Sequence, residues 1–174
     1  MQVKGETSIN KLILLFVFDK MECPLSERTL VDMCTSSNEW INYMDCMELI
    51  GKLLADDFIY EIPGIDEPLY NITPEGRETL ASFFIKIPRS LREEISRFVK
   101  NNGTKFRTKQ ECKADYYQNK DGSYTVFLKI LAPVQPMLEL KFVVPDKKTA
   151  NAIYKHWDDK ASELYSAVYE TLVD

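Results

Sequence analysis

The side chains best suited to chemistry in this chain are few and widely spaced. Its 174 residues include one histidine, His156, and four cysteines. Cys23, Cys34, Cys46 and Cys112 show no Cys-x-x-Cys spacing, so the ligand pattern of a zinc site is missing. No phosphate-binding glycine loop or nucleophile elbow occurs, and His156 lacks the partner groups of a catalytic site. We therefore expect no metal, no cofactor and no catalysis, with reduced, mostly buried thiols.

A second group of side chains has the chemistry needed to contact nucleic acid. Asn38, Trp40, Asn42 and Lys52 occur along residues 38–56, which we expect to form one helix. An asparagine amide can read adenine, and the N-terminal part of such a helix enters the major groove in helix-turn-helix proteins. These four residues are candidate DNA contacts. Alternatively, Asn42 is a solvated helix residue, because the same face is rich in carboxylates and has no arginine to read guanine.

The formal charge changes sign along the chain. Residues 1–85 contain six Lys and Arg against fifteen Asp and Glu, a net charge of −9, whereas residues 86–113 contain nine basic and three acidic residues, a net charge of +6. Since phosphate neutralisation supplies most non-specific affinity for DNA, residues 86–113, the basic belt, are expected to provide phosphate or partner contacts. Alternatively, the belt pairs with the acidic segment, within one chain or across a dimer. The candidate residues are Arg89, Arg92, Arg97, Lys100, Lys105, Arg107 and Lys109.

Three helices are expected before residue 57. Thr7 and Ser8 cap the first, whose run Leu12 to Phe18 is apolar on both sides and must be covered by the rest of the chain or by a second subunit. Pro24-Leu25-Ser26 opens the second. The third is the helix of residues 38–56. Its inward face is expected to consist of Tyr43, Met47, Ile50, Leu53 and Leu54.

A hairpin and an abrupt helix start are expected next. Residues 58–62 alternate apolar and polar, Pro63-Gly64 opens a turn, and residues 69–72 return as a second strand. Thr73 is the expected N-cap of the following helix and Pro74 its first residue, because proline has no N–H to leave unsatisfied there. This succession of strand, turn, strand and helix is typical of the wing of a winged helix.

The succession Ile50-x-x-Leu53-x-x-x-Asp57-Phe58-Ile59, with Leu69-Tyr70-Asn71-Ile72-Thr73-Pro74-Glu75-Gly76, resembles the recognition-helix end and the wing of bacterial winged helix-turn-helix regulators. Many of those proteins carry glycine where Asp57 stands; aspartate tolerates the left-handed conformation of a helix C-cap at some cost. Nearly the whole chain is similar to a bacterial domain-of-unknown-function family that joins this module to a small C-terminal domain. The resemblance implies a fold and a regulatory role, and it supplies neither a known ligand nor a catalytic residue. The further residues that carry it are Lys11-Leu12-Ile13-Leu14-Leu15, Ile87-Pro88-x-x-Leu91, Ala152-Ile153, Trp157 and Tyr165.

The second half predicts a small sheet and a long last helix. A capping box at Ser90 opens a helix that Asn101-Asn102-Gly103 closes. Alternating residues then predict strands over 106–116, 124–132 and 137–144, the first two joined by a turn at Asp121-Gly122. Asp146 caps the final helix. Its apolar stripe is Ala150, Ile153, Trp157, Ala161, Leu164, Val168 and Leu172.

These elements predict an α+β protein: a winged helix-turn-helix module with a helical extension over residues 1–100, then a three-stranded antiparallel sheet with a C-terminal helix over residues 101–174, for dimerisation or sensing. No segment is long and apolar enough to span a membrane, and we expect a cytoplasmic location. The expected function is a transcriptional regulator that binds duplex DNA as a homodimer. The alternative is a winged-helix adaptor that has lost DNA binding and binds a protein partner. A small-ligand sensor that uses the space between the sheet and the last helix is compatible with either.

Overall fold

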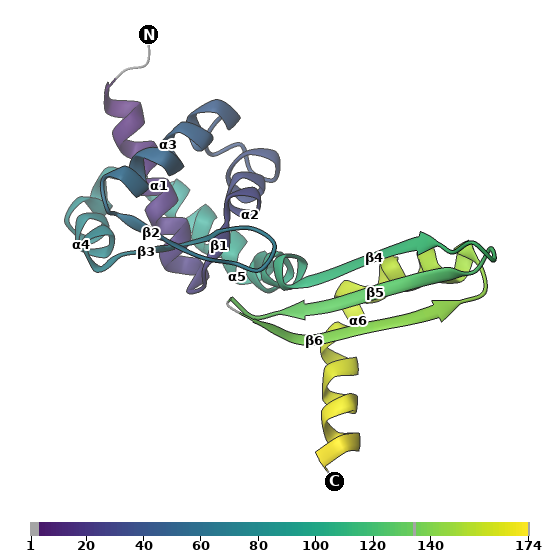
Figure 1. Cartoon of the computed structure of the whole chain (residues 1–174). Coiled ribbons are helices and arrows are strands. Elements are labelled where there is room, and N and C mark those ends of the chain that lie inside the picture. The colour runs from purple at the N-terminus through teal and green to yellow at the C-terminus, as the bar shows by residue number, and fades with distance from the viewer. Residues whose placement is uncertain (1–3, 134, 174) are drawn as a thin grey trace. The chain divides into compact units, whose positions relative to one another are not determined.

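The computed structural model describes the backbone of residues 4–133 and 135–173, with side chains from Ser8 onward. It divides into two compact units, residues 1–106 and residues 107–174, each described here by itself (Figure 1). Each unit combines helices with a three-stranded antiparallel sheet. The predicted α+β class is therefore confirmed.

Helix α1 (Lys4–Met21) is the centre of the first unit. It begins before the predicted Thr7–Ser8 cap, which was therefore wrong. All seven residues from Leu12 to Phe18 are at most 5% exposed, and the helix contacts α3 (Tyr43–Ala55), α4 (Pro74–Phe83) and strand β3 (Leu69–Ile72). Of the two covers considered for this run, the structure shows the one made by the chain itself.

The segment between α1 and α3 differs from the predicted helix. Leu25 and Ser26 form a short strand, β1, and Ser26 caps the short helix α2 (Glu27–Val31) by accepting a hydrogen bond from the Thr29 N–H at 3.2 Å. A π-helical turn, η1 (Asp32–Ser36), follows. The prediction of a helix start at Pro24 was wrong because β1 pairs with β3, Leu25 opposite Tyr70.

The predicted hairpin is confirmed. Strand β2 (Ile59–Ile62) pairs antiparallel with β3, Ile59 opposite Ile72 and Ile62 opposite Leu69. The sheet order is β1-β3-β2. Asp57, between α3 and β2, has a φ of 58°, so it takes the left-handed conformation expected of a helix C-cap.

The predicted start of α4 is also confirmed. Thr73 accepts a hydrogen bond from the Gly76 N–H at 3.0 Å, and Pro74 is the first helical residue. The Thr73 hydroxyl donates in turn to the Asp57 carbonyl at 2.7 Å. A Cβ atom on Gly76 would lie 2.2 Å from the Phe58 carbonyl oxygen. The helix start therefore packs directly on the end of α3 and the beginning of the hairpin.

Helix α5 (Arg89–Glu111) is longer than predicted. It begins one residue before the expected Ser90 cap, after the short 3₁₀ turn η2 (Phe84–Lys86), and it does not end at Gly103. Gly103 is buried, and a Cβ there would lie 3.3 Å from the Met21 sulfur of α1, so this glycine gives close helix packing instead of a stop signal. The strand predicted to start at residue 106 was therefore wrong, since residues 106–111 are helical.

The second unit is a meander covered by one helix. Strands β4 (Cys112–Gln118), β5 (Tyr124–Leu131) and β6 (Pro136–Val144) lie in sequence order, and Gly122 turns β4 into β5 with a φ of 87°. Helix α6 (Lys147–Val173) follows, and the predicted cap is confirmed by the Thr149 N–H donating to Asp146 at 2.9 Å. Its buried residues Ala150, Trp157 and Ala161 share a core with β4, β5 and Val144 of β6.

Two glycines in helices of the first unit are expected to respond oppositely to an added methyl group. Gly76→Ala should lower the free energy of unfolding by about 1–3 kcal/mol, because its Cβ would collide with backbone. Gly51→Ala, within α3, should raise it by about 0.5–1 kcal/mol, because nothing lies within 4 Å of that Cβ and alanine favours a helix. Urea unfolding of both variants measures this difference. Equal effects would contradict the packing described for α4.

Candidate functional site

Helix α3 starts later than the sequence pattern indicated. Its first residue is Tyr43, and Asn42 is its N-cap. The side-chain oxygen Oδ1 of Asn42 accepts from the Asp45 N–H at 2.9 Å, and its side-chain NH₂ donates to the Asp45 carboxylate. The prediction that this helix begins at residue 38 was therefore wrong, because the Asn42 side chain caps the helix and ends it on the N-terminal side. The Asn42 side chain holds the helix end and is not presented as an unengaged base-reading amide.

Asn38 and Trp40 lie in the connection before α3 and hold it to the core. The Asn38 amide donates to the Met33 carbonyl at 2.8 Å. The Trp40 indole N–H donates to the Glu94 carboxylate of α5 at 2.8 Å, and the indole packs edge-on against Phe98 with ring centroids 5.4 Å apart. Both side chains are half-buried. Their geometry is that of structural residues.

The exposed face of α3 is mostly apolar or acidic. Tyr43 is 57% and Met44 73% exposed, so Tyr43, predicted to point inward, points to solvent. Cys46 and Leu49 are buried beside the expected Ile50 and Leu53. Lys52 is on the exposed side and pairs with Glu48 at 2.5 Å. Such a surface pair contributes at most a few tenths of a kcal/mol, so Lys52 can exchange this partner for another anion at little cost.

The hairpin loop between β2 and β3 carries no basic side chain. Gly64 is required there because a Cβ would lie 1.9 Å from the Glu67 carbonyl oxygen. Asp66 and the exposed Ile65 occupy the loop. Any phosphate contact of this loop must therefore come from backbone N–H groups.

Most residues of the basic belt lie on one helix, α5. The seven candidates Arg89, Arg92, Arg97, Lys100, Lys105, Arg107 and Lys109 all lie on α5, six of them exposed and Arg92 half-buried. Two of them pair with carboxylates four residues along the same helix, Arg89 with Glu93 and Arg107 with Glu111, both at 2.8 Å. These two pairs are local, so they do not join the belt to the acidic segment as the alternative interpretation expected.

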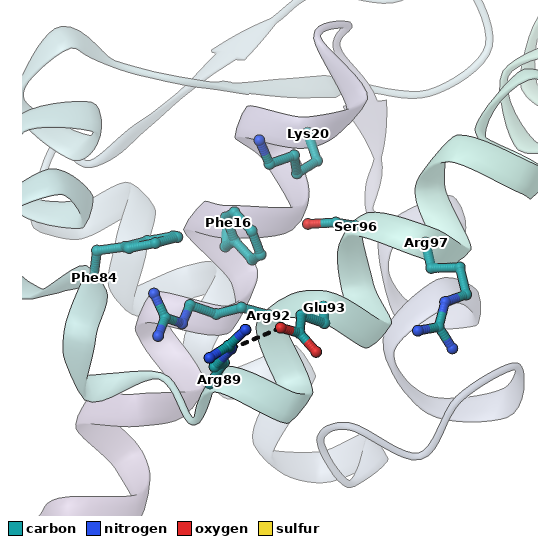
Figure 2. Close-up of a pocket in the computed structure, with 8 residues that line it drawn as sticks. All are labelled: Phe16, Lys20, Phe84, Arg89, Arg92, Glu93, Ser96 and Arg97. Carbon is teal, nitrogen blue, oxygen red and sulfur yellow. Dashed lines mark hydrogen bonds and ion pairs between the residues drawn. The ribbon is translucent and has the colours of Figure 1, made fainter.

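Three of these arginines come together around a pocket of about 500 Å³ in the first unit, here called the Arg92 pocket. Figure 2 shows Arg89 and Arg92 projecting from α5 beside Phe16 of α1, with Lys20 of α1 on the other side of that ring, whereas the guanidinium of Arg97 points away from them at the edge of the pocket. Phe84 and Ser96 complete the wall. Sequence analysis missed Phe16, Lys20, Phe84 and Ser96 because no motif links these segments; only the fold makes α1, η2 and α5 neighbours.

The second unit has an apolar groove of about 650 Å³ between the sheet and α6. Leu128, Leu140 and Phe142 line it from the sheet, and Ile153 and His156 line it from the helix. The groove occupies the space that we considered for a sensor ligand. His156 is exposed at its edge, as expected for a surface residue.

All four cysteines are free and buried. Burial is the main cause that raises the pKa of Cys112 to about 11, with the nearby charges of Asp158 and Glu111 adding to the effect. Cys34 and Cys46 share a hydrogen bond that raises the pKa of the Cys34 thiol and lowers that of Cys46. In the described part of the chain no cluster of His, Cys, Asp and Glu side chains is arranged to hold a metal ion. None of the helices described is both long and apolar enough to cross a bilayer.

These features define a two-unit α+β protein with a helical, hairpin-containing N-terminal unit and a basic pocket. The family model of the domain of unknown function DUF4364 matches residues 10–172, and the chain belongs to that family. Comparison with curated proteins and with solved structures gave no match. Membership of a domain-of-unknown-function family is thus confirmed.

Alanine variants of Trp40 and Tyr43 test whether the first residue stabilises the fold and the second lies on the surface. Trp40→Ala is expected to lower the free energy of unfolding by about 2–4 kcal/mol, because it removes the contact with Phe98 and leaves Glu94 without its indole donor. Tyr43→Ala, three residues away and exposed, should change it by less than about 0.5 kcal/mol. Urea denaturation measures both values. A destabilisation by Tyr43→Ala as large as that by Trp40→Ala would refute the assignment.

Proposed function

We propose that the chain is a cytoplasmic transcriptional regulator, related to bacterial winged helix-turn-helix regulators, that binds duplex DNA as a homodimer. The observation that carries this proposal is the topology of the first unit. The order α1, β1, α2, α3, β2, β3 and the sheet order β1-β3-β2 agree with a winged helix in which α3 precedes the wing hairpin. Because a fold by itself does not determine function, the proposal also depends on which side chains are exposed on α3 and α5.

In the proposed complex the exposed N-terminal half of α3 enters the major groove. Tyr43 and Met44 are exposed there and suit contacts with thymine methyl groups. Lys52 exchanges Glu48 for a phosphate. In this proposal α3 is positioned by the side chains of Asn38, Trp40 and Asn42. These residues were predicted to contact DNA directly and are now assigned a positioning role.

Phosphate neutralisation in this proposal comes from the middle of α5. Arg97, Lys100 and Lys105 are exposed and have no ion-pair partner among the described residues. Because the segment before residue 86 is strongly acidic, binding depends on these charges and should weaken steeply with salt.

The homodimer is proposed to form through the end of α6. Ala161 is the last buried residue of this helix, and no later residue in its described part is buried. Leu164, Val168 and Leu172 continue the apolar stripe beyond it at steps of four, and Leu172 is 79% exposed. A second copy of α6 would cover this stripe, and a two-fold axis would pair two DNA-reading helices.

A second candidate function is a protein-binding adaptor. It is favoured by the α3 surface, where Tyr43 and Met44 stand next to Glu48 and the only lysine is already paired. Exposed aromatic and Met side chains are enriched at protein interfaces, whereas DNA interfaces are strongly basic. In this alternative the first unit retains the winged-helix fold, and the exposed face of α3 binds a protein partner.

Selection of fragmented genomic DNA from the source organism on the purified full chain, at low and moderate salt, tests the proposal. The expected result is a shared, roughly palindromic motif. Met44→Ala combined with Lys52→Ala should reduce motif enrichment at least about tenfold, since each lost contact removes roughly 1 kcal/mol. Val168→Glu should yield a monomer by light scattering and abolish the palindrome, while Lys155→Ala, an exposed lysine of α6, serves as the control.

The outcomes separate the two candidates. No enrichment at either salt would contradict DNA binding and favour the adaptor. A motif that survives the Met44 and Lys52 substitutions unchanged would instead refute docking through α3.

A further inference from the structure

Arg92 has an unusual environment in the Arg92 pocket. Its guanidinium lies over the ring of Phe84, 4.6 Å from the ring centroid, and Phe84 is itself fixed by an edge-on contact with Phe16 at 5.3 Å. The Arg92 Nε is buried and has no hydrogen-bond partner in the part of the chain that the structure describes. The charged head is thus held in place by an aromatic ring while a buried donor remains unsatisfied. A buried donor without a partner is costly, and such groups usually mark a missing anion, water or ligand.

The charge around this pocket is not balanced by the protein. Four basic side chains line it, Lys20, Arg89, Arg92 and Arg97, against one carboxylate, Glu93. Arg89 neutralises Glu93 at 2.8 Å. Among the described residues Lys20 and Arg92 contact aromatic rings, with the Lys20 ammonium 5.4 Å from the Phe16 ring centroid, and neither forms an ion pair. Lys20, Arg92 and Arg97 therefore remain without an ion-pair partner among the described residues, and of these Lys20 and Arg92 lie on either side of Phe16, as Figure 2 shows.

We propose that the Arg92 pocket binds a small organic phosphate monoester. A phosphate monoester carries a charge of about −1.5 to −2 at pH 7, which matches the charges of Lys20 and Arg92, the two unpaired basic groups that flank Phe16. Guanidinium groups bind phosphate oxygens in a forked geometry, and the buried Nε of Arg92 is one of the donors of such a fork. Ser96, whose hydroxyl points towards Phe16 in Figure 2, adds a neutral donor.

The organic part of the ligand follows from the size and the walls of the pocket. A volume of about 500 Å³ lies in the range of small-molecule sites and exceeds what a bare phosphate ion fills. Phe16, Phe84 and the alkyl part of Lys20 give the pocket apolar surface next to its charges. The pocket is formed by α1, η2 and α5 and contains none of the α3 residues used in the proposed DNA contact. It shares Arg97 with the proposed phosphate contacts, but the ligand contacts inferred here are those of Lys20 and Arg92, so this inference does not rest on the proposed function.

Calorimetric titration of the full chain with phenyl phosphate at low salt tests the inference. Phenyl phosphate should bind at least about tenfold more tightly than inorganic phosphate, and benzyl alcohol, which lacks the charge, should not bind. Lys20→Gln and Arg92→Gln should each weaken binding by tenfold or more, because each removes one charge-assisted contact. Arg28→Gln, an exposed arginine of α2 outside the pocket, removes the same charge and should leave binding unchanged.

Several results would overturn the inference. They are no heat of binding with phenyl phosphate, equal affinity for inorganic phosphate, and binding that survives Lys20→Gln. Lys20→Gln is the decisive variant because this exposed side chain is not needed for packing, whereas a loss with Arg92→Gln is counted only if the thermal melt is unchanged. Binding of a short DNA duplex that depends on Lys20 and Arg92, without binding of phenyl phosphate, would assign these charges to the DNA backbone instead.

Discussion

Enclosure of α1 is the constraint on which the first unit depends. Leu12 to Phe18 is apolar around the whole helix, and every one of these side chains is removed from water by the chain itself. Burying a side chain of this size contributes roughly 1.5–3 kcal/mol, so the seven together make a large contribution to the stability of the first unit. Helices α3 and α4, the hairpin strand β3 and α5 take the positions that cover this helix.

That enclosure explains why some polar residues serve the fold and others remain available. The connection that brings α3 against the core is fixed by side-chain hydrogen bonds of Asn38, Trp40 and Asn42. In the described part of the first unit, two of the places with available chemistry are the exposed face of α3 and the Arg92 pocket, where α1 and α5 lie against each other. The first is weakly charged and the second strongly basic, so the two surfaces suit different partners.

Local signals in the sequence were enough to predict the hairpin and its flanks. Thr73 and Pro74 start α4 as expected, and Asp57 adopts the left-handed conformation, because turn and capping chemistry involves only residues a few positions apart. Gly103 was misinterpreted as a helix stop because its actual role, contact with Met21, involves a residue far away in the sequence. Lys20, Phe16 and Phe84 were missing from the predicted site for the same reason, since they are neighbours only in the fold. The start of α3 was predicted too early because Asn42 was not recognised as its N-cap.

Native-state hydrogen exchange of the α1 amides tests the central claim that this enclosed helix organises the first unit. The amides of Leu14 to Phe18 should exchange only through global unfolding of the unit, with the same free energy and denaturant dependence as its urea unfolding. The amides of the hairpin loop, which lack such burial, should exchange through smaller openings. Exchange of the α1 amides through local openings well below the global free energy would contradict the account.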